Sequence, residues 1–147
     1  MKATLRAVAA LAAVLLIAAC ASGPKFSEVS GSIPTLGADQ GRIYFYRTST
    51  LGAAIHPTIN LNGVAVGSSQ PGGFFFVDRP PGDYEVVMGT EVERKVTFTL
   101  AAAEVRYLRT SISFGILVGR PQAELVPPAE GAKEVADLAY TGPALTK

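Results

Sequence analysis

Residues 58–66, TINLNGVAV, constrain the fold more than any other part of this 147-residue chain. The pair Asn62-Gly63 suits a two-residue type I′ turn, because both central residues of that turn need a positive φ. Three facing pairs follow from such a turn: Leu61 with Val64, Asn60 with Ala65, and Ile59 with Val66. The larger apolar side chains then share one face, so turn chemistry and hydrophobic alternation independently predict a β-hairpin.

Strand signals continue on both sides of this hairpin, from Gly41 to Pro127. Short segments rich in β-branched and aromatic residues are separated by turn residues such as Pro81-Gly82. The expected strands are residues 42–47, the hairpin 58–66, and residues 74–77, 84–88, 92–100, 105–112 and 116–126. No long helix interrupts them, and there is no room for crossover connections. The predicted fold is all-β, a small antiparallel β-sandwich of about seven strands, with a small barrel as the alternative.

Two apolar runs allow more than one placement. The rings of Phe74, Phe75 and Phe76 cannot all lie on one face of a strand, so either the strand is buried on both sides or one ring is exposed. Burial in the core is the favoured interpretation. Residues 113–120, SFGILVGR, are apolar with glycines near each end. A core strand is favoured there over an exposed patch or a sheet edge that binds a partner.

The first twenty residues differ from the rest of the chain. Lys2 and Arg6 precede an uninterrupted apolar stretch at residues 7–19, which is typical of a secretory signal peptide. This stretch is shorter than the roughly 20 residues that a transmembrane helix needs. Its last residues and Cys20, Ile-Ala-Ala-Cys, resemble the lipobox of bacterial lipoproteins. The resemblance implies cleavage between Ala19 and Cys20 and attachment of lipid chains, palmitate among them, to Cys20. An ordinary signal peptide with an incidental cysteine is the alternative.

These patterns divide the chain into four parts. They are a signal peptide at residues 1–19, Cys20 with a flexible tether at residues 20–38, a β-sandwich domain at residues 39–128, and a short helix with a frayed tail at residues 129–147. The tether is rich in Ser, Gly and Pro. Packing of its apolar residues on the domain is the alternative; these are Phe26, Val29, Ile33 and Leu36.

The charge of the mature chain excludes one class of partner. Loss of residues 1–19 removes Lys2 and Arg6 and changes the formal net charge from +1 to −1. A nearly neutral domain offers no electrostatic basis for binding nucleic acid. Because Cys20 is the only cysteine, no internal disulfide can form.

Three motifs carry a resemblance to a known family: GRIYFYR, INLNGVAVG and GFFFVDRPPGDYEV. They resemble a domain-of-unknown-function family of bacterial lipoproteins, with an aromatic strand ending in Tyr-Arg, an Asn-Gly hairpin and a Pro-Gly turn that leads into a strand. The pattern is also similar to PEGA-like and transthyretin-like β-sandwiches. The resemblance covers roughly residues 39–128. It consists of turn and core positions, so it implies a fold and carries over no catalytic residue.

Few groups in this sequence suit catalysis. His56 is the only histidine, and Asp78 and Asp83 flank a Pro-Pro-Gly turn. A hydrolase acting on cell wall or lipid would need these three groups to converge in one pocket. We favour an edge position for His56, which precedes a proline, and turn hydrogen bonds for the two aspartates. The sequence predicts no cofactor and no metal site.

The sequence therefore favours a non-enzymatic, lipid-anchored module of the cell envelope. Ala21-Ser22, which follow the cysteine, favour the outer membrane over the inner membrane in lipoproteins of this kind, with the domain facing the periplasm. The expected partners are the membrane, through lipid on Cys20, and an envelope protein or cell-wall component. The candidate binding surface comprises Phe75, Arg47 and Arg109. The two arginines would gather with Arg42 and Arg106 on a sheet edge, although solvated strand ends are the favoured interpretation of these four arginines. A hydrolase and a carrier of small apolar ligands are the alternatives.

Overall fold

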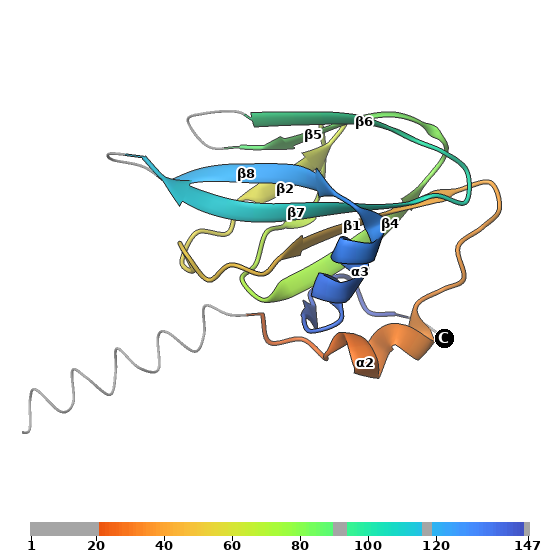
Figure 1. Cartoon of the computed structure of the whole chain (residues 1–147), viewed down its shortest axis with the longest axis horizontal. Coiled ribbons are helices and arrows are strands. Elements are labelled where there is room, and N and C mark those ends of the chain that lie inside the picture. The colour runs from red at the N-terminus through yellow and green to blue at the C-terminus, as the bar shows by residue number, and fades with distance from the viewer. Residues whose placement is uncertain (1–20, 90–93, 116–118, 146–147) are drawn as a thin grey trace, which may run out of the picture.

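The computed structural model of this chain describes residues 21–89, 94–115 and 119–145. Strands dominate this part of the molecule and form two stacked sheets, with short helices against the outer side of one of them (Figure 1). Residues 1–20 lie outside the described residues, so the structure does not test the predicted signal peptide or the predicted lipobox at Cys20.

The described part contains nine strands. They are β1 (Gly41–Arg47), β2 (Thr58–Leu61), β3 (Val64–Ser68), β4 (Gly73–Arg79), β5 (Gly82–Met88), β6 (Arg94–Leu100), β7 (Val105–Phe114), β8 (Gly119–Val126) and β9 (Ala139–Tyr140). The helical elements are α2 (Phe26–Val29), the 3-10 turn η1 (Ser30–Ser32) and α3 (Pro128–Val135).

The strands are ordered β8-β7-β1-β4-β9 in one sheet and β3-β2-β5-β6 in the other. This arrangement confirms the predicted all-β sandwich with a short C-terminal helix. Two strand pairs depart from antiparallel order: β1 runs parallel to β7, and β4 runs parallel to β9. Such pairs join segments far apart in the chain, which alternation within each strand does not specify.

The predicted hairpin forms with its turn at Asn62 and Gly63, whose φ angles are 48° and 78°. Leu61 faces Val64 and Asn60 faces Ala65, as the turn requires. The third predicted pair is wrong, because an irregularity after Ile59 shifts its partner from Val66 to Gly67. Val66 is thus an extra residue on β3, as in a β-bulge, which bends the strand and increases its twist.

Strand β1 is buried along its whole length, which explains why it is apolar and aromatic on both faces. Ile43 and Phe45 face the second sheet, whereas Tyr44 and Tyr46 face the helices. The Phe74-Phe75-Phe76 run on the neighbouring β4 follows the same rule: Phe75 stacks on Phe45, and Phe74 and Phe76 contact Tyr44 on the other side. The core interpretation of this run is confirmed.

Residues 21–29 pack on the domain, so the alternative left open for this segment holds in place of a flexible tether. The Phe26 ring lies 5.6 Å from that of Phe74. The Phe26 amide donates to the Leu138 carbonyl, and the Tyr140 amide donates to the Pro24 carbonyl. β9 in turn pairs with β4, so the domain begins before residue 39 and extends beyond residue 128. Burial of the apolar side chains on this segment favours the docked state.

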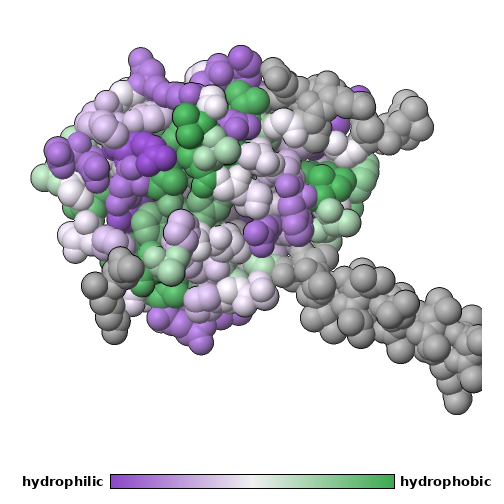
Figure 2. Space-filling model, turned by 180° about the vertical axis from the view of Figure 1, so that it is seen from behind, coloured by the Kyte–Doolittle hydropathy of each residue, from purple (hydrophilic) through white to green (hydrophobic). Residues whose placement is uncertain are grey.

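Residues 113–120 do not form one core strand. β7 ends at Phe114, β8 begins at Gly119, and these two residues face each other across the hairpin. Residues 116–118 lie outside the described residues, so part of this prediction stays untested. Phe114 is 57% exposed. Hydrophobic surface is also visible at this end of the molecule when it is viewed from behind (Figure 2).

Candidate functional site

Phe75 was a candidate for a binding surface, and the structure places it in the core, which was the favoured interpretation of its strand. The side chain is 4% exposed and its ring lies 5.2 Å from that of Phe45. A Cβ added at Gly67 would lie 2.6 Å from the Phe75 ring, so this glycine makes room for it. Phe75 therefore fills the space between the sheets and presents no surface to a partner.

Arg47 is also buried, although it is charged. It is fully inaccessible and donates to four carbonyl oxygens at 2.6–3.0 Å, those of Ser49, Leu51, Gly52 and Ile55. Burial lowers the pKa of Arg47. The carbonyl dipoles supply the compensation that a buried cation needs. Arg47 therefore holds the loop 48–57 in place through these carbonyl oxygens, and it is not part of a binding surface.

Arg109 is engaged by carboxylates from two elements. Its Nε donates to Glu124 on β8, and its Nη1 donates to Glu130 and Glu134 on α3, each at 2.8 Å. Hydrogen bonding, first to Glu124, raises the pKa of Arg109 even though burial opposes the shift. These bonds tie α3 to the five-stranded sheet, so the Nε and Nη1 donors of Arg109 are engaged within the molecule.

The expected arginine cluster on a sheet edge does not form. β1, which carries Arg42 and Arg47, is the central strand of its sheet. Arg42 makes an ion pair with Asp78, and Arg106 pairs with Glu104. The four arginines serve separate parts of the fold and do not make one basic surface.

The groups named for a hydrolase do not converge either. Asp78 pairs with Arg42 near the start of β1, whereas His56 lies in the loop that follows the end of that strand, where its Nε2 is 2.8 Å from the Ala53 carbonyl. Five residues of strand, roughly 16 Å, separate these ends. Asp83 accepts a hydrogen bond from Thr99 in the other sheet. Each group has its own local partner.

Between the sheets, the described residues Phe45, Ile59 and Phe75 line a void with no room for a water-sized sphere, so this void does not hold an apolar ligand. A groove of about 330 Å³ lies elsewhere, between the N-terminal segment and the C-terminal tail, and is lined in part by Pro24, Val29 and Leu145.

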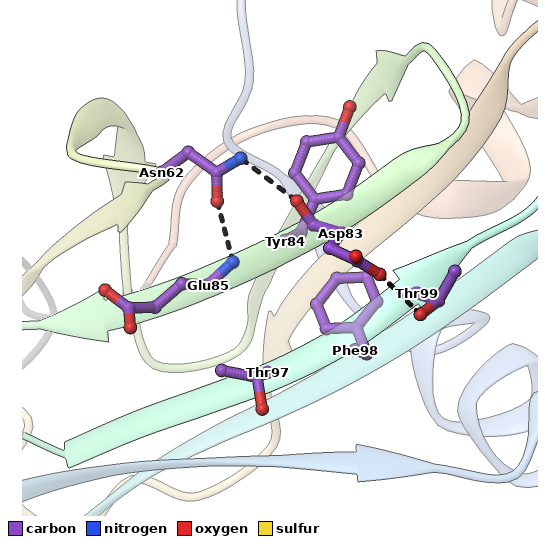
Figure 3. Close-up of a pocket in the computed structure, with 7 residues that line it drawn as sticks. All are labelled: Asn62, Asp83, Tyr84, Glu85, Thr97, Phe98 and Thr99. Atoms are coloured by element: carbon purple, nitrogen blue, oxygen red, sulfur yellow. Dashed lines mark hydrogen bonds between the residues drawn. The ribbon is translucent and has the colours of Figure 1, made fainter.

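A cleft of about 480 Å³ opens on the four-stranded sheet, and sequence reasoning missed it (Figure 3). Strand alternation directs Asp83, Glu85, Thr97 and Thr99 to the solvent face, while the rings of Tyr84 and Phe98 stack toward the core. The Asn62 side chain closes one side, donating to the Asp83 carbonyl and accepting from the Glu85 amide. The only signal in the sequence was the polar face of two neighbouring strands.

The side chains that line this cleft are mainly hydrogen-bond acceptors. Two carboxylates and two hydroxyls line it, and the Asp83 carboxylate already accepts a 2.6 Å bond from Thr99. Carboxylates accept hydrogen bonds from amines, amides and hydroxyls. The cleft therefore suits a polar partner that offers N–H or O–H groups.

The start of the described chain is a second feature that sequence reasoning missed. The Ala21 amide donates a 2.9 Å hydrogen bond to the Pro71 carbonyl, in the turn between β3 and β4. A Cβ added at Gly73 would lie 3.0 Å from the Ala21 Cβ, so the two backbones are in close contact. The residue directly after Cys20 is thus fixed on the domain.

The described residues lack two features, a membrane-spanning helix and a cluster of metal-binding side chains. Within residues 21–89, 94–115 and 119–145, no helix is long and apolar enough to cross a membrane. The same part of the chain contains no group of three or more His, Cys, Asp or Glu side chains arranged to hold a metal ion.

Comparisons with known proteins support one part of the resemblance, a domain-of-unknown-function family. A protein of Haemophilus influenzae described as "Uncharacterized protein" is 26% identical over 129 residues, which cover 84% of this chain and 77% of the relative. No solved structure gives a significant match. The model of the family described as "Protein of unknown function (DUF2846)" matches residues 37–121. This match spans more than half of the chain, which therefore belongs to that family.

Proposed function

We propose that this protein is a non-enzymatic lipoprotein of the cell envelope, anchored through lipid on Cys20 and binding another envelope component. One observation carries the proposal: the lipobox-like residues 17–20 directly precede Ala21, whose amide is hydrogen-bonded to Pro71 of the folded domain. Several acyl chains on one cysteine would make a lasting anchor, since each buried methylene contributes about 0.8 kcal/mol. The likeness to PEGA-like or transthyretin-like sandwiches belongs to this proposal as well.

The placement of the cleft supports a role in binding. Ala21 lies at the end of β1 marked by Arg47, because the Gly72 amide, next to Pro71, donates to the Arg47 carbonyl. The cleft lies toward the other end, where Gly82 pairs with Leu100 and Leu100 approaches Gly41. An anchor at Cys20 would thus leave the cleft directed away from the membrane. In an outer-membrane lipoprotein facing the periplasm, it would be open to an envelope protein or to the cell wall.

Metabolic labelling tests the anchor. Cells that express the full chain should incorporate labelled palmitate into the protein, and the protein should fractionate with the outer membrane. Cys20→Ser should abolish both the label and the membrane association, because the chain has no other thiol. Equal palmitate incorporation in wild type and Cys20→Ser would contradict the proposal.

Site-specific crosslinking in intact cells tests the binding role. A photoreactive residue at Thr97, exposed in the cleft, should capture a reproducible envelope component. The matched control is Lys133, which is exposed on α3 and lies outside the cleft. Capture at Thr97 that depends on Cys20 and is absent at Lys133 supports the proposal. No reproducible product at Thr97 counts against the cleft as the binding surface.

A further inference from the structure

The docked N-terminal segment determines how far an anchored Cys20 could stand from the domain. Successive Cα atoms are 3.8 Å apart, so Cys20 lies within one residue of the contact between Ala21 and Pro71. The Tyr140 amide donates to Pro24, and a Cβ added at Gly23 would lie 1.7 Å from the Tyr140 carbonyl oxygen. The segment is therefore held tightly along β9, and a free tether of eighteen residues is not available to lift the domain off a bilayer.

Several segments meet at the end of the molecule where this contact lies. The loop 48–57 follows Arg47, and the turn 68–73 contacts Arg47 through the Gly72 amide. Because β7 runs parallel to β1, its last residues reach the same end. Figure 1 shows the described chain beginning on the side of the molecule that carries the β7–β8 hairpin.

The described residues at this end carry few charges. Residues 21–24, 48–57, 68–73, 111–115 and 119–121 contain no aspartate or glutamate, and Arg120 is their one lysine or arginine. Arg94 and Lys95 begin β6 at this same end, because Arg94 pairs with Met88 and Met88 pairs with Ile59. Seven charged residues occupy residues 39–42, 78–83 and 99–106 at the opposite, charged end: Asp39, Arg42, Asp78, Arg79, Asp83, Glu104 and Arg106. In these segments the carboxylates therefore all lie at the charged end, and the Ala21 end carries positive charge alone.

Apolar side chains are exposed at the Ala21 end. Leu51 is 56% exposed and Phe114 is 57% exposed. Ile55 lies between the two segments that carry them, because its Cδ1 would be 2.6 Å from a Cβ added at Gly119, opposite Phe114. A Cβ added at Gly52 would lie 2.9 Å from Ile112 on β7, so the loop and the hairpin form one continuous surface. Hydrophobic surface is visible at this end in Figure 2.

We infer that this surface, made of Leu51, Ile55 and Phe114 with Arg120 beside it, rests on the lipid bilayer in which Cys20 is anchored. The inference depends on the proposed function, because it takes lipidation of Cys20 as given. Apolar side chains enter the boundary between headgroups and acyl chains, and a nearby arginine is attracted to anionic headgroups. The domain thus lies on the membrane in one orientation, with the charged end and the cleft directed outward.

Depth-dependent fluorescence quenching tests this orientation. The full chain is expressed with its signal sequence, so that lipid occupies the Cys20 sulfur and a newly introduced cysteine is the one reactive thiol. Leu51→Cys and Phe114→Cys are labelled with an environment-sensitive fluorophore and placed in vesicles of phosphatidylethanolamine and phosphatidylglycerol. Some of the lipids carry a quencher near the top of the acyl chain. Val64→Cys is the matched control, since Val64 is 64% exposed and lies next to the Asn62-Gly63 turn at the charged end.

We expect quenching at positions 51 and 114 to exceed that at position 64 by roughly twofold or more, because interfacial groups lie about 5–10 Å deep. Equal, weak quenching at all three positions, with the wild-type thiol blocked by lipid, overturns this inference and leaves the proposed function standing. A wild-type Cys20 that reacts with the fluorophore shows that lipid is absent, and overturns both.

A second variant tests the docking step. Gly23→Val should displace the N-terminal segment from Tyr140, because no side chain fits at that position. In combination with Leu51→Cys it should reduce the quenching at position 51 to the level of the Val64→Cys control. Membrane association through Cys20 should be unchanged. Undiminished quenching in this variant would show that docking of residues 21–26 does not set the orientation.

Discussion

Arg42 and Asp78 form a two-point ion pair between the neighbouring strands β1 and β4, with Nε–Oδ1 and Nη2–Oδ2 distances of 2.6 and 2.7 Å. The Arg42 side chain is only 7% exposed, and its guanidinium also lies 4.4 Å from the centre of the Phe76 ring. Removing the carboxylate leaves a buried cation without its partner. We expect Asp78→Ala to lower the free energy of unfolding by about 3 kcal/mol.

Urea unfolding of the unlipidated chain from Ala21 onward, followed by circular dichroism, measures this loss. The matched control is Glu85→Ala, which removes the exposed ion pair between Glu85 and Lys95 at 3.4 Å. An exposed pair of this kind contributes less than about 1 kcal/mol. If both variants lose the same amount, the pair between Arg42 and Asp78 is not the stabilising contact that its burial implies.

Arg47 supports the loop 48–57 through four carbonyl oxygens, and a lysine cannot reproduce this geometry. The guanidinium donates from three nitrogens in a fixed plane, whereas an ammonium group donates from one point. We expect Arg47→Lys to cost about 2–4 kcal/mol of folding free energy, since buried carbonyls lose their partners. Hydrogen exchange of the Ile55 amide, which is bonded to Gly52, should also become faster.

Arg120→Lys is the control for that substitution. Arg120 is exposed, so its replacement should change stability by less than about 0.5 kcal/mol. A loop that exchanges at the wild-type rate in Arg47→Lys would contradict the role assigned to the buried guanidinium.

Tyr46 should make folding sensitive to alkaline pH. Burial, and then its hydrogen bond to Glu134, raise the pKa of Tyr46 above the usual value of 10.0. A raised pKa in the folded state means that the folded protein holds its proton more tightly. The resulting stability is complete below about pH 10 and is lost as the pH rises toward the folded-state pKa, at up to about 1.4 kcal/mol per pH unit.

Tyr46→Phe should therefore show a smaller fall in unfolding free energy between pH 9.5 and 11 than wild type, roughly 1 kcal/mol less over that range. Burial also raises the pKa values of Tyr107 and Tyr140, so a residual fall is expected in the variant. Urea titrations at each pH give the two slopes. Identical slopes would mean that Tyr46 does not contribute to the alkaline dependence.

Local patterns in the sequence predicted the elements that short-range chemistry determines. The Asn62-Gly63 turn formed because its residues tolerate positive φ, and the Phe74-Phe75-Phe76 run of β4 was recognised as core because it is apolar on both faces. The shift at Ile59 was not predictable, since a bulge changes the register without changing the alternation in sequence.

Long-range contacts account for what the sequence did not predict. Phe26 packs on Phe74, and residues 21–26 run along β9, but composition alone makes this segment resemble a flexible linker. Arg47 was assigned to a surface because arginines are seldom buried, and the carbonyl oxygens that enclose it come from a loop whose shape no local motif specifies. The cleft between Asp83 and Thr99 likewise depends on the pairing of β5 with β6.

Gly131→Ala in α3 should lower the stability of the protein, which is the opposite of the usual effect of replacing a helical glycine with alanine. Replacing a mid-helix glycine with alanine normally stabilises a protein by about 0.5–1 kcal/mol. Here a Cβ would lie 2.3 Å from Cγ and 2.4 Å from Cβ of Tyr107, at the rigid base of that side chain. The helix would have to move off the sheet, so we expect Gly131→Ala to destabilise the protein by about 1–3 kcal/mol.

Two comparisons isolate this contact from general helix effects. Gly31→Ala introduces a Cβ with nothing within 4 Å and should be close to neutral. In a Tyr107→Gly background both contacting atoms, Cγ and Cβ, are gone, so Gly131→Ala should become neutral or stabilising and the double-mutant cycle should show a coupling energy above about 1 kcal/mol. Urea unfolding of the four variants supplies these values. A stabilising Gly131→Ala in the wild-type background would mean that α3 does not lie as close to β7 as the Tyr107 contact requires.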